Sequence, residues 1–352
     1  MTSELDKLSA EFLPAIESEI RSVLLSDRNP ADRHLAAPDQ FYGMMHYHMG
    51  WLDENLQPLF HNSGHNSGKR IRPILCLLSC AVGGGNWQKA IPAAAAIEIL
   101  HNFSLVHDDI QDASPTRRGR ATLWTLWGEA QAINTGDAIF AKAHLALNRL
   151  IERETSPAIV VQAFRRFDET CIELTKGQYM DMRFESLGLV SVEDYLSMIA
   201  GKTAALVSLC CELGAMTAEA SQTIVDHMAQ FGQNLGLAFQ VHDDILGIWG
   251  DESVTGKSAA TDIVTRKKTL PVLYALEKSS ALKTLYEGQA NGQEFVRNAV
   301  SLLDETGARH YAEERAKYYS QEALAHLEAI NPTGDAGTAL FQLSHMLLQR
   351  DH

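Results

Sequence analysis

Hydrophobic positions recur about every three to four residues along most of the chain, which is the spacing of an α-helix with one buried face. Alternating runs bounded by hairpin turns, which are typical of β-strands, do not stand out. Several of the ten prolines lie near the ends of the apolar periodic segments. The pattern predicts helices at 5–28, 39–56, 69–82, 88–112, 128–153, 157–186, 192–217, 220–250, 268–278, 291–307, 308–329 and 336–350.

The linkers between these helices predict the domain organisation. No low-complexity segment separates two halves of the chain, and no repeat of solenoid length is present. Hydrophobic residues make up 45% of the 352 residues, enough for a large core. We therefore expect a single all-α domain over 1–352, built as one large helical bundle.

Charge and cysteine content narrow the class of protein. The formal net charge of -14 argues against nucleic acid as the main partner. The N-terminus is an acidic amphipathic helix pattern rather than a signal peptide, and no uncharged apolar run reaches the roughly 18 residues of a membrane span. The five cysteines form no CxxC pair, which favours free thiols in a reducing compartment. These features predict a cytoplasmic protein.

One acidic phrase occurs twice inside apolar segments: VHDDIQD at 106–112 and VHDDILG at 241–247. A helix places Asp108 and Asp112 on one face, where like charges repel and burial without a partner costs several kcal/mol. A hard divalent cation such as Mg²⁺, shared with phosphate oxygens, removes that cost. A single Asp-Asp pair is also compatible with a solvated helix end, but the second copy at Asp243 favours two jaws that hold a diphosphate through metal ions.

Basic clusters follow both acidic phrases. They lie in the loops at 113–124 and 249–271, and a third basic cluster precedes the first phrase at 61–73. All three suit a polyanion held together with metal. Other phosphate and metal motifs fit less well. GDESVTGKS at 250–258 has one residue too many between its glycines for a P-loop, IAGKTAAL at 199–206 lacks the upstream glycine, and neither HExxH nor an EF-hand loop occurs.

These motifs together resemble the trans-isoprenyl diphosphate synthases. The resemblance is strongest over 60–275 and is carried by GKRIRP (68–73), HNFSLVHDDIQD (101–112), RRGR (117–120), GQYMD (177–181), GKTAAL (201–206), FQVHDDILG (239–247) and RKKTLP (266–271). It implies an all-α enzyme, usually a homodimer, that condenses isopentenyl diphosphate head-to-tail with an allylic diphosphate. It also implies Mg²⁺, three ions per active site.

The same resemblance assigns roles to residues of this chain. The implied metal-binding residues are Asp108, Asp109, Asp112, Asp243 and Asp244. The implied contacts to the allylic diphosphate are Arg117, Lys202, Lys257 and Lys267, and those to isopentenyl diphosphate are Lys69, Arg72, His101 and Arg118. Thr203 and Gln240 are expected to line the reaction centre, with Gln178 and Asp181 positioning Lys202 and the metal shell. The catalytic set is then Asp108, Asp112, Arg117, Lys202, Thr203, Gln240, Asp243 and Lys267.

The second acidic phrase departs from the family pattern, which often has a third aspartate where this chain has Gly247. Either Asp251 or water is expected to complete the metal shell, and an aspartate placed at 247 is expected to strengthen Mg²⁺ binding. Product length is expected to depend on Phe103, with the small Ser104 beside it. That pair is similar to geranylgeranyl diphosphate synthases.

Three other readings stay open at this point. A farnesyl diphosphate synthase shares every motif, and a class I terpene cyclase shares the metal motifs but needs no site for isopentenyl diphosphate. A silent regulatory subunit of the same fold would be expected to lose metal ligands, yet all five aspartates are present.

Overall fold

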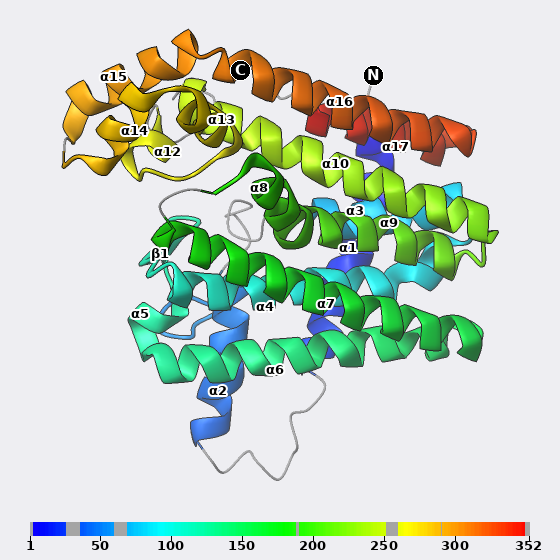
Figure 1. Cartoon of the computed structure of the whole chain (residues 1–352). Coiled ribbons are helices and arrows are strands. Elements are labelled where there is room, and N and C mark those ends of the chain that lie inside the picture. The colour runs from blue at the N-terminus through cyan, green and yellow to red at the C-terminus, as the bar shows by residue number, and fades with distance from the viewer. Residues whose placement is uncertain are drawn as a thin grey trace. The chain divides into compact units, whose positions relative to one another are not determined.

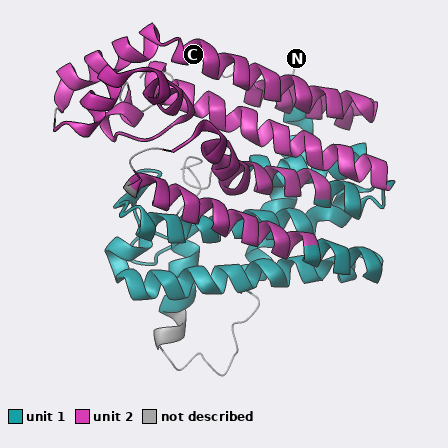
Figure 2. Ribbon diagram, in the orientation of Figure 1, with its two compact units in different colours: residues 1–165, 213–221 teal, residues 166–212, 222–352 magenta. Residues whose placement is uncertain are grey.

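The computed structural model of the chain describes residues 3–25, 36–59, 69–187, 190–250, 260–289 and 291–348, without the side chains of 36–39 and 186. The chain divides into two compact units, Met1–Arg165 with Leu213–Ser221 and Arg166–Glu212 with Gln222–His352 (Figure 2). Each unit is helical, which confirms the all-α fold. The single domain over 1–352 stays a prediction.

Unit 1 is built around one buried helix. Its elements are α1 (Glu4–Leu25), α2 (Ala36–His48), α3 (Ile71–Val82), η2 (Trp87–Ala90), α4 (Ile91–Gln111), β1 (Thr116–Arg117), β2 (Arg120–Ala121), α5 (Leu123–Trp127), α6 (Glu129–Asn148) and η3 (Arg149–Arg153), followed by the start of α7 (Pro157–Ser186). Every residue from Ile91 to Leu100 is buried, because α1, α3 and α6 pack around α4. Helices α4 and α6 run side by side (Figure 1).

A glycine permits the close approach of these two helices near the acidic phrase. A Cβ at Gly136 on α6 would lie 2.4 Å from the His107 ring on α4. A larger residue at 136 would therefore force the His107 ring to move. The glycine thus leaves room for the His107 ring, directly before Asp108, to lie against α6.

Unit 2 contains the rest of α7 and the second acidic phrase. Its elements are α8 (Val192–Ile199), the π-helical turn η4 (Ala200–Ala204), most of α9 (Ala205–Thr217), α10 (Gln222–Trp249), α12 (Thr261–Val264), α13 (Leu270–Lys278), α14 (Ser280–Glu287), α15 (Gly292–Glu305), α16 (Ala308–Ala329) and α17 (Gly334–Leu348). Helix α10 packs along α16 (Figure 1).

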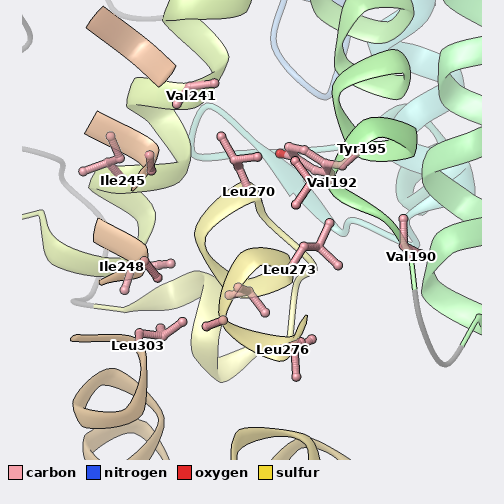
Figure 3. Packing of buried hydrophobic residues seen from close by; sticks show 14 of the residues in the cluster. Val190, Val192, Tyr195, Val241, Ile245, Ile248, Leu270, Leu273, Leu276 and Leu303 are labelled. Atoms are coloured by element: carbon pink, nitrogen blue, oxygen red, sulfur yellow. The ribbon is translucent and has the colours of Figure 1, made fainter. Parts of the chain in front are cut away.

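The core of unit 2 surrounds the second acidic phrase. Val241, Ile245 and Ile248 project from one face of α10 toward side chains of α13, α8 and α15 (Figure 3). The neighbours in this cluster include Leu270, Leu273, Leu276, Val192, Tyr195 and Leu303. Because the apolar side chains of α10 face this core, its aspartates are held at fixed positions on the same helix.

Most predicted helices match the structure within a few residues, and the exceptions have local causes. The helix predicted over 39–56 ends at His48, because Gly50 takes a φ of 80° and Leu52 pairs with Pro58 as an isolated bridge. The sequence reading missed the short hairpin of β1 and β2, together with α5, α12 and α14. The predicted stretches 26–28 and 349–350 lie outside the described residues.

Candidate active site

The first acidic phrase lies at the C-terminal end of α4. Asp108 is half-buried in the last turn, and Asp112 is the exposed C-cap residue whose N–H donates to the Asp108 carbonyl at 2.8 Å. A helix C-terminus carries partial negative charge, which disfavours carboxylates there. Two accessible carboxylates one turn apart at this end fit Mg²⁺, which usually takes one or two from the protein. Within the described ranges, no three His, Cys, Asp or Glu side chains group into a metal site by themselves.

Asp109, between them, faces the protein rather than solvent. It is 2% exposed, and the Arg117 Nε donates to its Oδ1 at 2.8 Å. Burial raises the pKa of Asp109, and the Arg117 charge opposes that rise. Asp109 therefore ties Arg117 to α4, and its place in the metal shell stays a prediction.

Arg117 belongs to a tight hairpin formed by RRGR. Arg117 pairs with Arg120, and the two residues between them have left-handed φ values, 53° at Arg118 and 74° at Gly119. Two left-handed residues make the two-residue turn that suits hairpins, with glycine at the second position. Arg120 anchors the hairpin by donating to the Tyr47 carbonyl at 2.9 Å and stacking over the Tyr47 ring. Arg118 is thereby held at the tip.

The hairpin forms one wall of a basic pocket. Its lining includes Tyr47 and His48 of α2 together with Asp109, Arg117, Arg118 and Arg120. The pKa of His48 is lowered to about 3 by burial and by the charges of Arg118 and Arg117. Sequence reasoning missed His48, since the two histidines of MHYH (45–48) match no catalytic or metal-binding motif.

A second histidine, His101, is also surrounded by positive charge that acts on its pKa. Burial, followed by the charges of Arg72 and Arg118, lowers the pKa of His101 well below its usual value. The Arg72 Nη1 lies 3.2 Å from the His101 Nε2 and donates to it. Lys69 is exposed just before α3. The predicted residues Arg72, His101, Arg117 and Arg118 thus share one electropositive environment that suits a diphosphate.

In unit 2, α7 and the π turn present the predicted lysine. A Cβ at Gly177 would lie 2.2 Å from the Lys202 backbone nitrogen, so only glycine lets α7 approach η4 this closely. The Lys202 ammonium pairs with the Asp181 carboxylate of α7. A π turn inside a helix is frequently found at functional sites. Asp181 and Lys202 are therefore brought together as predicted, and Gln178 lies on the same helix as Asp181.

A chain of hydrogen bonds continues from the π turn to α10. The Thr203 hydroxyl donates to the Gln240 Oε1 at 2.9 Å, and the Gln240 Nε2 donates to the Asp244 Oδ1 at 3.1 Å. The Asp244 Oδ2 accepts from the Tyr195 hydroxyl at 2.5 Å and from the Leu270 N–H at 3.3 Å. Both Asp244 oxygens are thus engaged by protein donors.

Asp244 also shapes the charge of Lys267. Burial raises the pKa of Asp244 to about 6. Burial lowers the pKa of Lys267, but the charges of Asp244, Asp262 and Asp181 outweigh this and raise it. Lys267 is therefore held protonated beside Asp243, in the part of unit 2 that also contains Lys202 and Asp181.

The residue that replaces the third aspartate of the family pattern has an unexpected neighbour. The carboxylate of Asp262 from α12 lies against Gly247. The alternative considered from the sequence, Asp251, lies outside the described residues, as does Lys257. Asp262 was missed because no spacing relates it to the acidic phrase.

The predicted chain-length residues lie on α4, one to two turns before Asp108. The half-buried Phe103 ring packs in tilted orientation against His107 and against Phe140 of α6, with ring centroids 4.7 and 4.8 Å apart. The Ser104 hydroxyl donates to the His101 carbonyl at 2.9 Å. Phe103 thus belongs to an aromatic layer rather than to the fully buried core.

Comparisons with known proteins define the class. Residues 52–303 match the family model of the polyprenyl synthetases. The geranylgeranyl diphosphate synthase of Mycobacterium tuberculosis is 38% identical over 356 residues, covering 98% of each chain, and the (2E,6E)-farnesyl diphosphate synthase of the same organism is 37% identical over 304 residues, covering 86% of this chain and 78% of that one. The crystal structure of a polyprenyl synthetase from Streptomyces coelicolor is similar with a TM-score of 0.83 and 32% identity, covering 98% of each chain.

Such a helical chain with paired aspartate phrases is a short-chain trans-prenyltransferase. It belongs to the polyprenyl synthetase family.

One stretch could be mistaken for a membrane helix. Val192–Thr217 has the length and apolar composition of a span, but 67% of its most apolar window is buried within the protein. It also contains Lys202 in the π turn. A core helix of a folded domain passes the same test, so this is weak evidence for a span.

Proposed function

We propose that the chain condenses isopentenyl diphosphate head-to-tail with an allylic diphosphate, and that its main product is geranylgeranyl diphosphate. The observation that carries this proposal is the basic pocket of unit 1. Arg72 and His101, with the hairpin arginines Arg117 and Arg118, form an anion site beside the acidic phrase of α4. A terpene cyclase would have no use for this additional diphosphate site. The geranylgeranyl product is supported by the 38% identity to a geranylgeranyl diphosphate synthase, in an alignment that covers 98% of both chains.

Mg²⁺ would be held by Asp108 and Asp112 of α4 and by Asp243 of α10, with three ions per site expected. Bound there, it would supply positive charge to the diphosphate that leaves. Lys202, Lys267 and Arg117 would add fixed charges to the same leaving group, with Lys257 nearby. Asp181 pairs with the Lys202 ammonium, and the charge of Asp244 outweighs burial and raises the pKa of Lys267.

The reaction proceeds by ionisation and addition. The allylic C1–O bond breaks, and its electron pair leaves with the diphosphate. The double bond of isopentenyl diphosphate, whose diphosphate is held by Lys69, Arg72, His101 and Arg118, then attacks the allylic carbon. The resulting cation loses a proton, for which the departing diphosphate is an adequate base. Thr203 and Gln240 line this centre and are fixed by their mutual hydrogen bond.

We also propose that the chain acts as a cytoplasmic homodimer in which 1–352 works as one domain. Large apolar side chains of unit 1 remain exposed on α6 and on the start of α7, and a second copy would cover them. They are Ile133, Leu145 and Val161. A monomer in sedimentation at micromolar concentration would contradict the dimer.

The function is tested by incubating the purified chain with labelled isopentenyl diphosphate, farnesyl or geranyl diphosphate and Mg²⁺, followed by chromatography of the dephosphorylated products. We expect labelled twenty-carbon alcohol. A fifteen-carbon end product would instead identify a farnesyl diphosphate synthase. Unlabelled cyclic hydrocarbon would identify a terpene cyclase, and no turnover with either primer would favour a silent subunit.

The two diphosphate sites are tested separately. Arg72→Ala is expected to raise mainly the KM for isopentenyl diphosphate, since Arg72 belongs to the pocket with His101. Lys202→Ala is expected to lower mainly kcat, because its charge acts on the leaving group. If both variants changed only the parameters of the allylic substrate, the GKRIRP assignment would be wrong.

A further inference from the structure

Arg70 differs in placement from the two cationic residues on either side of it. Lys69 is exposed and Arg72 is half-buried, whereas Arg70 is 6% exposed. Its backbone has a left-handed φ of 50°, directly before the first residue of α3. A non-glycine residue in that region is strained and persists only where its surroundings fix it. Something in unit 1 therefore holds Arg70 inward.

Two carboxylates hold it. The Arg70 Nη1 donates to the Glu98 Oε1 of α4 at 2.6 Å, and the Nη2 donates to the Glu17 Oε2 of α1 at 3.2 Å. Both carboxylates have a second donor, because the Asn102 Nδ2 lies 3.3 Å from the Glu98 Oε1 and the Trp51 Nε1 lies 2.7 Å from the Glu17 Oε1. Both terminal nitrogens of Arg70 are thus engaged by protein carboxylates, which direct its side chain into unit 1.

The position of Glu98 on α4 gives this contact its significance. His101 lies three residues after Glu98, so both side chains are on one face of α4. Glu98 holds Arg70, and His101 accepts from Arg72 at 3.2 Å. The start of α3 is therefore attached to α4 through Arg70 and Arg72, two residues apart, and the segment between Lys69 and Arg72 has a fixed direction.

Glu98 also acts on the hairpin arginine. Burial lowers the pKa of Arg118, the charge of Glu98 opposes this, and the charges of Arg70, Arg117 and Arg72 add to the lowering. The buried Glu98 carboxylate therefore offsets repulsion among the cations before a diphosphate binds. The buried Arg70–Glu98 pair thus affects both the direction of the segment between Lys69 and Arg72 and the charge balance of the pocket.

We propose that Arg70 is a positioning residue for isopentenyl diphosphate: clamped by Glu98 and Glu17, it sets the direction in which Lys69 and Arg72 meet the diphosphate. This inference rests on the proposed function. It assigns to the Arg70–Glu98 pair a role in one substrate's affinity rather than in overall stability alone.

The test compares the KM values of Arg70→Lys with those of a control variant, Arg149→Lys, which alters a different arginine–glutamate pair that involves α1. Lysine keeps the charge but cannot reach both carboxylates through a planar fork. We expect the KM for isopentenyl diphosphate to rise about tenfold, as for loss of one charged hydrogen bond, with the KM for the allylic substrate unchanged and kcat within about threefold. The control is Arg149→Lys, because Arg149 makes a comparable 3.1 Å bond to Glu19 of α1 away from the pocket. It should leave both KM values unchanged.

A cycle with Glu98→Gln provides a second readout. If the pair acts as a unit, the double variant should raise the KM for isopentenyl diphosphate by less than the product of the single effects. Should buried-pair variants fail to fold, Glu17→Gln carries the test, because Glu17 is partly exposed (31% for its side chain) and its loss is better tolerated. A rise of about threefold in the same KM is then expected.

Equal changes in both KM values, or a loss of melting temperature with no change in either, would overturn the positioning role. Failure of the unaltered chain to incorporate isopentenyl diphosphate would instead overturn the proposed function, so the two failures are distinguishable.

Discussion

The carboxylate of Asp262 fills the space beside Gly247 that a side chain would occupy: a Cβ at position 247 would lie 2.1 Å from the Asp262 Oδ2. The glycine at the third position of VHDDILG is therefore matched to an aspartate supplied by α12. This changes the sequence-based expectation that an aspartate at 247 strengthens Mg²⁺ binding. A carboxylate there would meet another carboxylate at contact distance, and both steric overlap and like charge oppose it.

We expect Gly247→Asp to lower the melting temperature and weaken Mg²⁺ activation, with an overpacking cost of about 1–3 kcal/mol. The compensating double variant Gly247→Asp with Asp262→Gly should recover much of both losses, because it moves one carboxylate rather than adding one. The measurements are thermal unfolding and initial rate against Mg²⁺ concentration. A single variant that is as stable as the parent and needs less Mg²⁺ would contradict this account.

Loss of either accessible aspartate phrase should stop catalysis without unfolding the chain. Asp108→Ala and Asp243→Ala are each expected to lower kcat by about 100-fold or more, as for the loss of a group that stabilises charge in the transition state. The matched control is Asp226→Ala, since Asp226 is exposed on the same helix as Asp243 and accepts a hydrogen bond from the Gln222 side chain at 2.8 Å. Circular dichroism should be unchanged in all three. Full activity in excess chelator would contradict the metal role.

The helices were predictable from the sequence because each buries one face, and burial repeats with the helical period. The same signal gives the aspartates, since carboxylates on an apolar face are conspicuous. The helical pattern could not reveal the role of Glu98. In the sequence Glu98 is a lone acidic residue in an alanine-rich helix, but in the structure it pairs with Arg70, 28 positions earlier. Tyr195 and Asp262 were missed for the same reason, because their roles depend on tertiary contacts with Asp244 and Gly247.

The hairpin of RRGR was missed for a different reason. Its two strands have two residues each, too short for an alternating pattern. The glycine at its second turn position was the available signal, since a left-handed residue is needed there. The sequence therefore predicted Arg117 and Arg118 as functional residues, but it did not predict that Arg117 lies in a strand and Arg118 in the turn that follows it.

His48 should make the chain less stable in mild acid. Its pKa is lowered to about 3 by burial and neighbouring arginines, against 6.5 for an ordinary histidine. Between these values the unfolded state binds the proton and the folded state does not, so stability falls as the pH drops below about 6.5. From pH 7 to pH 5 this contributes a loss of about 2 kcal/mol.

His48→Gln should remove that part of the pH dependence, because glutamine does not titrate. Urea unfolding at pH 7 and pH 5 gives the comparison, and His310→Gln on α16 in unit 2 is the control that should leave the difference unchanged. A His48→Gln variant with the same loss between the two pH values would show that His48 is protonated in the folded chain.

Phe103 should limit the length of the product. Its ring is half-buried on α4 before Asp108 and packs in tilted orientation against Phe140 of α6, so truncation would open space in that aromatic layer rather than in the closed core. We expect Phe103→Ala to shift products beyond twenty carbons, and Ser104→Phe to shift them toward fifteen by adding bulk beside it. Phe140→Ala should act in the same direction as Phe103→Ala, because each ring supports the other. Phe167→Leu on α7 is the control, since Phe167 is fully buried and should affect melting temperature but not product length. Chromatography of the dephosphorylated products separates these cases, and an unaltered distribution in all Phe103, Ser104 and Phe140 variants would place the limit on another helix.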